Sequence, residues 1–201
     1  IWICISSIFD STVVDSKILL ENCALHGKSI KLTWLKALIF DFDGLILDTE
    51  TPLFTAWSAI FREHGAELVL EEWAACLGAD DEAFDAAEHL SKLTGKVINR
   101  EFIYEDCNTR ALREINQSEP LPGVVPLLEH ARQANLAVGL ASSSPRSWVE
   151  GHLQRLNLIH FFDCIVCKED VVKVKPAPDL FLLALRRLGI AQNNTAIFED
   201  S

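Results

Sequence analysis

The chain has 201 residues, of which 49% are hydrophobic and 23% charged, a composition typical of a folded globular protein rather than a disordered one. Its 29 acidic and 18 basic residues give a formal net charge of −11. That charge argues against a nucleic-acid partner, because general nucleic-acid binders present basic surface to the phosphates. The sequence also predicts no transmembrane segment and no membrane partner, because it lacks a run of about 20 uninterrupted apolar residues.

The first half of the chain predicts a leader, one buried strand and a block of helices. Residues 1–36 begin with an apolar run and are interpreted as a leader, with an added strand as the alternative. Residues 37–41 form a short apolar run that ends in an acid, which is typical of a buried parallel strand. Helical spacing of apolar residues follows over 52–64 and ends at Gly65. Further helical patterns occupy residues 70–77, 80–93 and 99–117.

After a break rich in proline and glycine at 119–123, the second half alternates helices with strands. The predicted helices are 124–134, 146–156 and 179–188, and the predicted strands are 136–141, 163–167 and 195–198. Such alternation implies a parallel sheet covered on both faces. We therefore predict an α/β fold, with a Rossmann-like core at 37–52 and 121–201 and an inserted helical cap at 53–120. The chain stops directly after an apolar run, so we expect the core to be incomplete at its C-terminal end.

Cysteine usage points to a reducing compartment. Six cysteines are scattered through a chain too long to depend on disulfide bonds for its stability. Cys164 and Cys167 lie in a predicted strand, where a spacing of three directs side chains to opposite faces. The pair is therefore interpreted as free buried thiols rather than a zinc or redox site, and the predicted location is the cytoplasm.

Polar residues gather at the carboxyl ends of four predicted strands, which is where open α/β sheets bind ligands. In chain order the clusters are Asp41-Phe42-Asp43-Gly44, Ser142-Ser143-Ser144, Lys175-Pro176 and Glu199-Asp200. Because the carboxyl ends of parallel strands meet at one edge of a sheet, we expect these side chains to form one site. A single acid at a strand end is more often a turn or helix cap, but four such clusters favour a convergent site.

The segment 41–50, DFDGLILDTE, resembles the first signature motif of the haloacid dehalogenase superfamily, and the later clusters resemble its second, third and fourth motifs in order. Residues 140–144 and 174–179 are similar to the β-phosphoglucomutase-like branch of small-molecule phosphatases. The resemblance covers residues 37–201. It implies Mg²⁺-dependent hydrolysis of a small phosphate monoester, such as a sugar phosphate or a related metabolite phosphate.

The resemblance also implies a role for each residue. Asp41 would be the nucleophile that forms an aspartyl-phosphate, which divides one difficult hydrolysis into two easier displacements. Asp43 would protonate the leaving oxygen and then activate water for the second step. Lys175 would place a positive charge against the phosphate and the nucleophile. Gly44 would let the backbone turn tightly enough to bring both acids to one centre.

The same resemblance implies the ligands of the metal and of the phosphate. Mg²⁺ prefers oxygen ligands and shares one or two carboxylates with a substrate phosphate. The implied ligands are Asp41, the backbone carbonyl of Asp43, Asp200, and Glu199 directly or through water. Ser142, with Ser143 and the amides that follow it at a helix N-terminus, would hold the phosphoryl oxygens.

Two other functions stay open. A sugar phosphomutase of the β-phosphoglucomutase type would return the phosphoryl group to another hydroxyl of the same sugar. Mutases of that type bind the distal end of the sugar phosphate with cap residues that include a basic one. Residues 76–81, CLGADD, supply acids and no arginine, which disfavours a mutase. A non-catalytic, truncated binding module is the second alternative, and the combination of Asp41, Asp43 and Lys175 argues against it.

Overall fold

The computed structural model describes residues 2–4, 34–74 and 85–200, which fall into two compact units. One unit is formed by residues 1–47 and 119–201, and the other by residues 48–118. Most of the segment interpreted as a leader, residues 5–33, lies outside the described residues, as does the stretch 76–81 on which the mutase argument depends.

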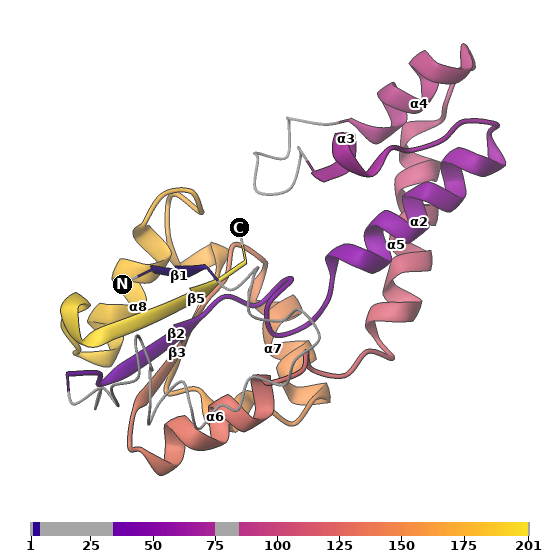
Figure 1. Ribbon diagram of the computed structural model, residues 1–201. Helices are drawn as coiled ribbons and strands as arrows, with labels where there is room; N and C mark the ends of the chain where they lie inside the picture. The colour runs from indigo at the N-terminus through magenta and orange to yellow at the C-terminus, as the bar shows by residue number, and fades with distance from the viewer. Residues whose placement is uncertain (1, 5–33, 75–84, 201) are drawn as a thin grey trace, which may run out of the picture. The chain divides into compact units, whose positions relative to one another are not determined.

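The first unit is built on a five-stranded, all-parallel sheet in the order β1-β5-β2-β3-β4. Figure 1 labels β1, β5, β2 and β3 of this sheet. Its strands are β1 (Trp2–Cys4), β2 (Ala37–Phe40), β3 (Ala137–Ala141), β4 (Cys164–Val166) and β5 (Thr195–Glu199). The predicted α/β fold with a parallel sheet is confirmed. β2 lies in the middle, paired with β3 on one side and β5 on the other, so its carboxyl end is flanked by both neighbouring strand ends.

Helices cover both faces of this sheet (Figure 1). They are α6 (Val124–Gln133), α7 (Arg146–Arg155) and α8 (Asp179–Leu188), with the short 3₁₀ helices η1 (Ile159–Phe161), η2 (Lys168–Asp170) and η3 (Gln192–Asn194). Buried Ile39, Ala141 and Ile197 pack in one apolar cluster with the inner side of α8. Because side chains alternate along a strand, Phe40 faces away from that cluster, and its ring stacks on Phe198 with centroids 4.9 Å apart.

The second unit is helical, as the sequence predicts for this region. It contains α2 (Glu50–Glu63), α3 (Leu70–Ala74), α4 (Ala86–Thr94) and α5 (Arg100–Ile115). α2 packs along α5, where the ring of Trp57 meets Tyr104 edge-on at 4.9 Å. Arg110 of α5 reinforces the pair through an ion pair with Glu63 at 2.6 Å. Among the described helices of both units, none is long and apolar enough to cross a membrane.

Candidate active site

The turn after β2 carries the first acids of the site. Asp41 follows β2 directly, and its backbone N–H continues the ladder by donating to the Phe198 carbonyl at 2.9 Å. Gly44 has φ +72°, a conformation that residues with a Cβ rarely adopt. A methyl group at Gly44 would also overlap the Asp200 carboxylate. A glycine is therefore needed both for the turn and for the close approach of Asp200.

Asp41, Lys175 and Glu199 meet at the carboxyl ends of the central strands. The Lys175 ammonium lies 2.7 Å from Asp41 Oδ1 and 3.0 Å from Glu199 Oε1. All three side chains are largely shielded from water, with exposed fractions of 16% for Lys175, 11% for Asp41 and 9% for Glu199. Sequence reasoning places Glu199 after the last strand, whereas the structure makes it the last residue of β5. Its carboxylate still reaches the site.

The buried acids of this cluster outweigh the one buried cation. Burial raises the pKa of Asp41 to about 7, Lys175 lowers it in part, and the Glu199 carboxylate raises it. Burial also raises the pKa of Asp200, and the neighbouring Glu199 carboxylate acts in the same direction. The site therefore disfavours the ionised forms of its own acids, and a further positive charge would stabilise them.

The residues present fit a divalent cation. Asp41, Glu199 and Asp200 each offer a carboxylate oxygen, and these atoms all lie within 4.8 Å of one another. An all-oxygen, multiply negative donor set suits hard cations such as Mg²⁺. Asp43 is not a member of this carboxylate group, and its predicted contribution is a backbone carbonyl.

The side chain of Asp43 is engaged by a different part of the chain. Ser144 Oγ donates to Asp43 Oδ2 at 2.6 Å, and Trp148 Nε1 donates to Oδ1 at 2.9 Å. Sequence analysis missed both contacts: it places Ser144 in the serine cluster without a partner and assigns no role to Trp148. Only the placement of α7 beside the turn after β2 brings them to Asp43.

The serine loop itself is fixed mainly by internal bonds. Ser142 is buried, its N–H donates to the Val166 carbonyl at 3.0 Å, and its Oγ accepts the Ser144 N–H at 3.0 Å. Ser142 Oγ also lies 3.5 Å from Asp43 Oδ2. The Ser143 hydroxyl is buried and has no hydrogen-bond partner within the described residues. Ser143 lies between Ser142 and Ser144, whose hydroxyls both face Asp43 Oδ2.

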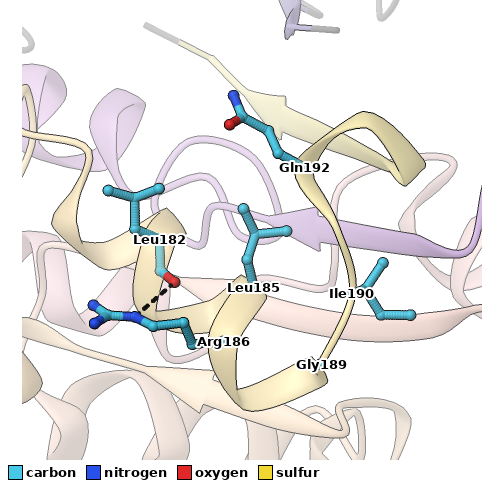
Figure 2. A pocket seen from close by; sticks show the side chains of 6 residues that line it. All are labelled: Leu182, Leu185, Arg186, Gly189, Ile190 and Gln192. Atoms are coloured by element: carbon cyan, nitrogen blue, oxygen red, sulfur yellow. Dashed lines mark hydrogen bonds between the residues drawn. The ribbon is translucent and has the colours of Figure 1, made fainter.

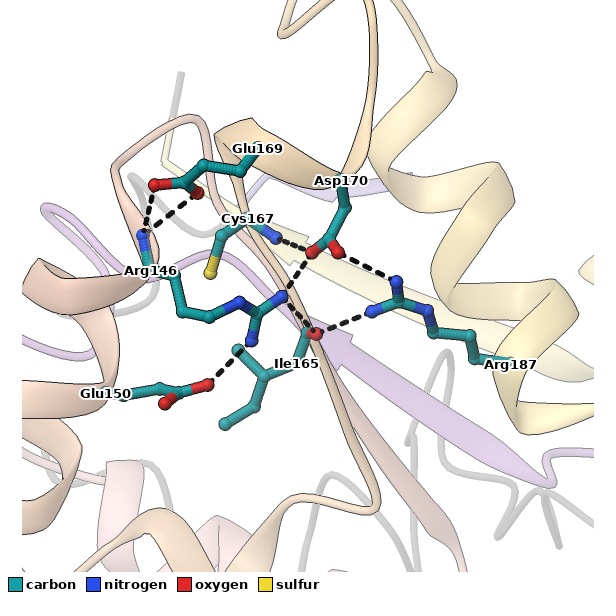
Figure 3. Close-up of polar contacts among 7 residues, drawn as sticks. All are labelled: Arg146, Glu150, Ile165, Cys167, Glu169, Asp170 and Arg187. Atoms are coloured by element: carbon teal, nitrogen blue, oxygen red, sulfur yellow. Dashed lines mark hydrogen bonds and ion pairs between the residues drawn. The ribbon is translucent and has the colours of Figure 1, made fainter.

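A polar network supports this loop from behind (Figure 3). Arg146, the first residue of α7, pairs with Glu150 at 2.6 Å and with Asp170 of η2. Arg187 of α8 pairs with the other oxygen of Asp170 at 2.8 Å. Asp170 also accepts the backbone N–H of Cys167 at 2.8 Å. These contacts join α7, η2 and α8, so the network is structural support for the loops that carry the serines and Lys175.

The two described thiols at β4, Cys164 and Cys167, do not form a reactive pair. Cys164 and Cys167 are free, and Cys167 is buried. Burial raises the pKa of the Cys167 thiol to about 11, which keeps it protonated and a poor nucleophile.

A separate hollow of about 560 Å³ lies at the C-terminal end of α8 (Figure 2). Its lining is Leu182, Leu185, Arg186, Gly189, Ile190 and Gln192. Arg186 Nε donates to the Leu182 carbonyl at 3.3 Å within this lining. The hollow contains none of the predicted site residues and no carboxylate. The chemistry of the unit is therefore concentrated at the acidic cluster.

The site combines a buried aspartate after the central strand of a parallel sheet with a lysine and further carboxylates from other segments. This combination is typical of an enzyme that transfers a phosphoryl group. The chain belongs to the haloacid dehalogenase-like hydrolase family, whose family model matches residues 38–201. This confirms the resemblance noted in the sequence.

Named relatives agree with this assignment. The chain is 41% identical to “Putative phosphatase YhcW” of Bacillus subtilis (strain 168), over 83% of this chain and 76% of that protein. It is 32% identical to “Fructose-1-phosphate phosphatase YqaB” of Escherichia coli (strain K12), over 82% of this chain and 86% of that protein. A solved structure described as a “putative beta-phosphoglucomutase from Thermotoga maritima” superimposes with a TM-score of 0.68 at 27% identity, covering 83% of this chain and 77% of that one. The protein is an enzyme of the phosphatase type within this family, which argues against the non-catalytic alternative.

Proposed function

We propose that this enzyme hydrolyses a small phosphate monoester, a sugar phosphate or related metabolite phosphate, through an aspartyl-phosphate on Asp41, with Mg²⁺ as cofactor. The observation that carries the proposal is the contact of Lys175 with both Asp41 and Glu199, beside the carboxylate of Asp200. A buried nucleophile, a cation and a set of oxygen ligands at one point are what phosphoryl transfer requires.

Asp41 is the nucleophile in this mechanism. Its carboxylate oxygen attacks phosphorus, the bond from phosphorus to the substrate oxygen breaks, and the phosphoryl group is left on Asp41. Attack needs the ionised carboxylate, which burial opposes and Lys175 favours. Lys175 therefore has two tasks: it keeps Asp41 in its reactive form and offsets the charge of the incoming phosphate.

Asp43 supplies and removes the proton. In the first step it donates a proton to the leaving oxygen, so that the product departs as an alcohol. In the second step the Asp43 carboxylate takes a proton from water, which attacks the phosphorus of the aspartyl-phosphate and releases inorganic phosphate. Ser142, Ser143 and the amides that follow Ser142 hold the phosphoryl oxygens, a role supported by the position of this loop beside Asp43.

Asp41, Glu199, Asp200 and the backbone carbonyl of Asp43 would hold the Mg²⁺ ion. When bound, the ion neutralises negative charge on the phosphate and on its carboxylate ligands. The raised pKa of Asp41 and the crowding of three carboxylates support the need for such a cation.

The proposed substrate class follows the names of relatives, one of which is a fructose-1-phosphate phosphatase. A phosphomutase is the second candidate, favoured by the structural likeness to the β-phosphoglucomutase neighbour. We propose further that the helical unit 48–118 is the cap that selects the substrate, and that the enzyme is cytoplasmic.

A phosphate-release screen on a panel of metabolite phosphates tests the proposal, with Asp41→Asn as the matched blank. We expect release in Mg²⁺, strong loss in chelator, recovery when Mg²⁺ is restored, and no release by the blank. Full activity after thorough metal removal would contradict the Mg²⁺ requirement, and an active Asp41→Asn variant would contradict the nucleophile. Isomer formation from glucose 1-phosphate without free phosphate would instead favour the mutase.

A further inference from the structure

Two donors from the serine loop and α7 fix both oxygens of the Asp43 carboxylate. Ser144 Oγ lies 2.6 Å from Oδ2, and Trp148 Nε1 lies 2.9 Å from Oδ1. Neither donor comes from the turn that carries Asp43 itself. A carboxylate held at both oxygens by groups on another element has its rotamer set from outside its own loop.

The indole of Trp148 is itself held in place. Its ring meets the His152 ring edge-on at 4.3 Å, and the buried His152 ring lies 6.2 Å from the ring of Phe42. Phe42 is fully buried between Asp41 and Asp43. Burial and the nearby Arg155 lower the pKa of His152, which favours the neutral imidazole suited to such packing. Ring contacts from Trp148 through His152 to Phe42 therefore fix the indole relative to the turn that carries Asp41 and Asp43.

The hydroxyl of Ser144 is equally constrained. The Ser144 N–H donates to Ser142 Oγ at 3.0 Å, and the Ser144 carbonyl accepts the Lys168 N–H at 3.2 Å. These bonds fix the backbone of Ser144, which keeps its side chain within reach of Asp43.

The two partners are not equivalent. An indole N–H can only donate, so Oδ1 remains an acceptor whether or not Asp43 carries a proton. A serine hydroxyl can donate or accept, so Ser144 can partner either state of Oδ2. The two partners can therefore hold the Asp43 carboxyl group in either protonation state.

We propose that Trp148 and Ser144 are positioning residues for Asp43, which hold its carboxyl group in the orientation needed for proton transfer to the leaving oxygen. The proposal rests on the function proposed above for Asp43. It predicts that losing either donor impairs reactions that need protonation of the leaving group far more than reactions that do not.

The test compares two substrates through kcat/KM, which reports the steps up to the first irreversible one. When the P–O bond of fructose 1-phosphate breaks, the sugar oxygen is a poor leaving group that needs a proton, whereas p-nitrophenyl phosphate releases a stable phenolate without one. For Trp148→Phe, which keeps an aromatic ring on His152, we expect a loss of about 10- to 100-fold with fructose 1-phosphate. With p-nitrophenyl phosphate we expect a change of less than about threefold.

Ser144 and a neighbouring serine provide the matched variants. Ser144→Ala should show the same selective loss, and Ser144→Thr, which keeps the hydroxyl, should restore most of the activity. Ser147→Ala, at an exposed position of the same helix, should behave as the parent. Equal losses on both substrates, unchanged values on both, or no rescue by threonine would overturn the positioning role. Asp43→Asn separates the two proposals, because normal fructose 1-phosphate activity in that variant would refute the proposed role of Asp43 itself.

A second measurement does not depend on activity. The chain has five tryptophans, so its indole N–H groups are resolvable by ¹H–¹⁵N NMR, and the signal missing in Trp148→Phe belongs to Trp148. We expect that signal to move on Asp43→Ala and to exchange slowly with solvent in the parent. A Trp148 signal that is unchanged by Asp43→Ala would overturn the contact and with it the proposal.

Discussion

Replacing Asp41 by asparagine should stabilise the metal-free protein at alkaline pH, even though it removes the proposed nucleophile. The pKa of Asp41 rises from 3.8 to about 7 in the folded chain, chiefly because the carboxyl is buried. Below pH 3.8 the group is protonated in both states and costs nothing. As the pH rises, the unfolded chain ionises first, and stability is lost progressively until the folded group also ionises near pH 7. At about 1.4 kcal/mol per unit, a shift of roughly three units corresponds to a loss of about 4 kcal/mol.

The amide that replaces the carboxyl in Asp41→Asn cannot ionise, so the variant escapes this loss. In chelator at pH 8 we expect Asp41→Asn to unfold with a free energy up to about 4 kcal/mol higher than the parent, with the difference shrinking toward zero near pH 4. Urea denaturation followed by circular dichroism over this pH range measures it. Asp43→Asn is the matched control: it makes the same substitution two residues away, at a partly buried side chain that accepts hydrogen bonds from Ser144 and Trp148. A gain that is absent, or constant between pH 5 and pH 8, would refute the assignment of the cost to buried Asp41.

Three further predictions concern the acidic site and the polar network that supports it. Gly44→Ala, whose methyl group would meet the Asp200 carboxylate, should weaken Mg²⁺ binding at least tenfold by calorimetry. Gly65→Ala shares the positive φ but has open space around it, so it should cost about 1 kcal/mol in stability and leave Mg²⁺ binding unchanged. Lys175→Met should destabilise the metal-free protein by about 3 kcal/mol at pH 8, because the ionised Asp41 loses its cation. The loss should be smaller at pH 5, where Asp41 is protonated and needs no cation. Equal losses at both pH values would contradict this. Asp170→Ala removes one ion pair from each of Arg146 and Arg187 and leaves the Cys167 N–H without its acceptor. Its thermal unfolding should show a loss of about 2–3 kcal/mol, and a neutral result would contradict a supporting role.

Much of the fold follows from local pattern. The apolar run before Asp41 and the alternation after residue 123 require a parallel sheet, and a parallel sheet brings its carboxyl ends to one edge. That explains why Asp41 and Glu199 meet although they are far apart in the chain, whereas Lys175 comes from the loop between η2 and α8. The strand β1 matches the alternative of an added strand for residues 1–36, but the apolar run alone does not indicate its pairing with β5.

The partners of Asp43 could not be predicted in the same way. A tryptophan on an amphipathic helix has the same sequence signature whether its indole packs in a core or donates to an acid. The difference depends on how α7 is placed relative to the turn after β2, which is a tertiary property. The Gly44–Asp200 contact is of the same kind: the sequence indicates a turn at Gly44, but not that a carboxylate occupies the space of the missing side chain.

The most direct test of the central claim is to find the phosphoryl group on the enzyme. The Asp43→Asn variant should be mixed with acetyl phosphate and Mg²⁺, because this substrate needs little help in releasing its leaving group and the variant cannot activate water for the second step. Acid quenching, proteolysis and mass spectrometry then locate any adduct. We predict a single added phosphoryl group on Asp41 that hydroxylamine removes and that Asp41→Asn abolishes. Turnover without any covalent adduct, or an adduct on another residue, would contradict the account.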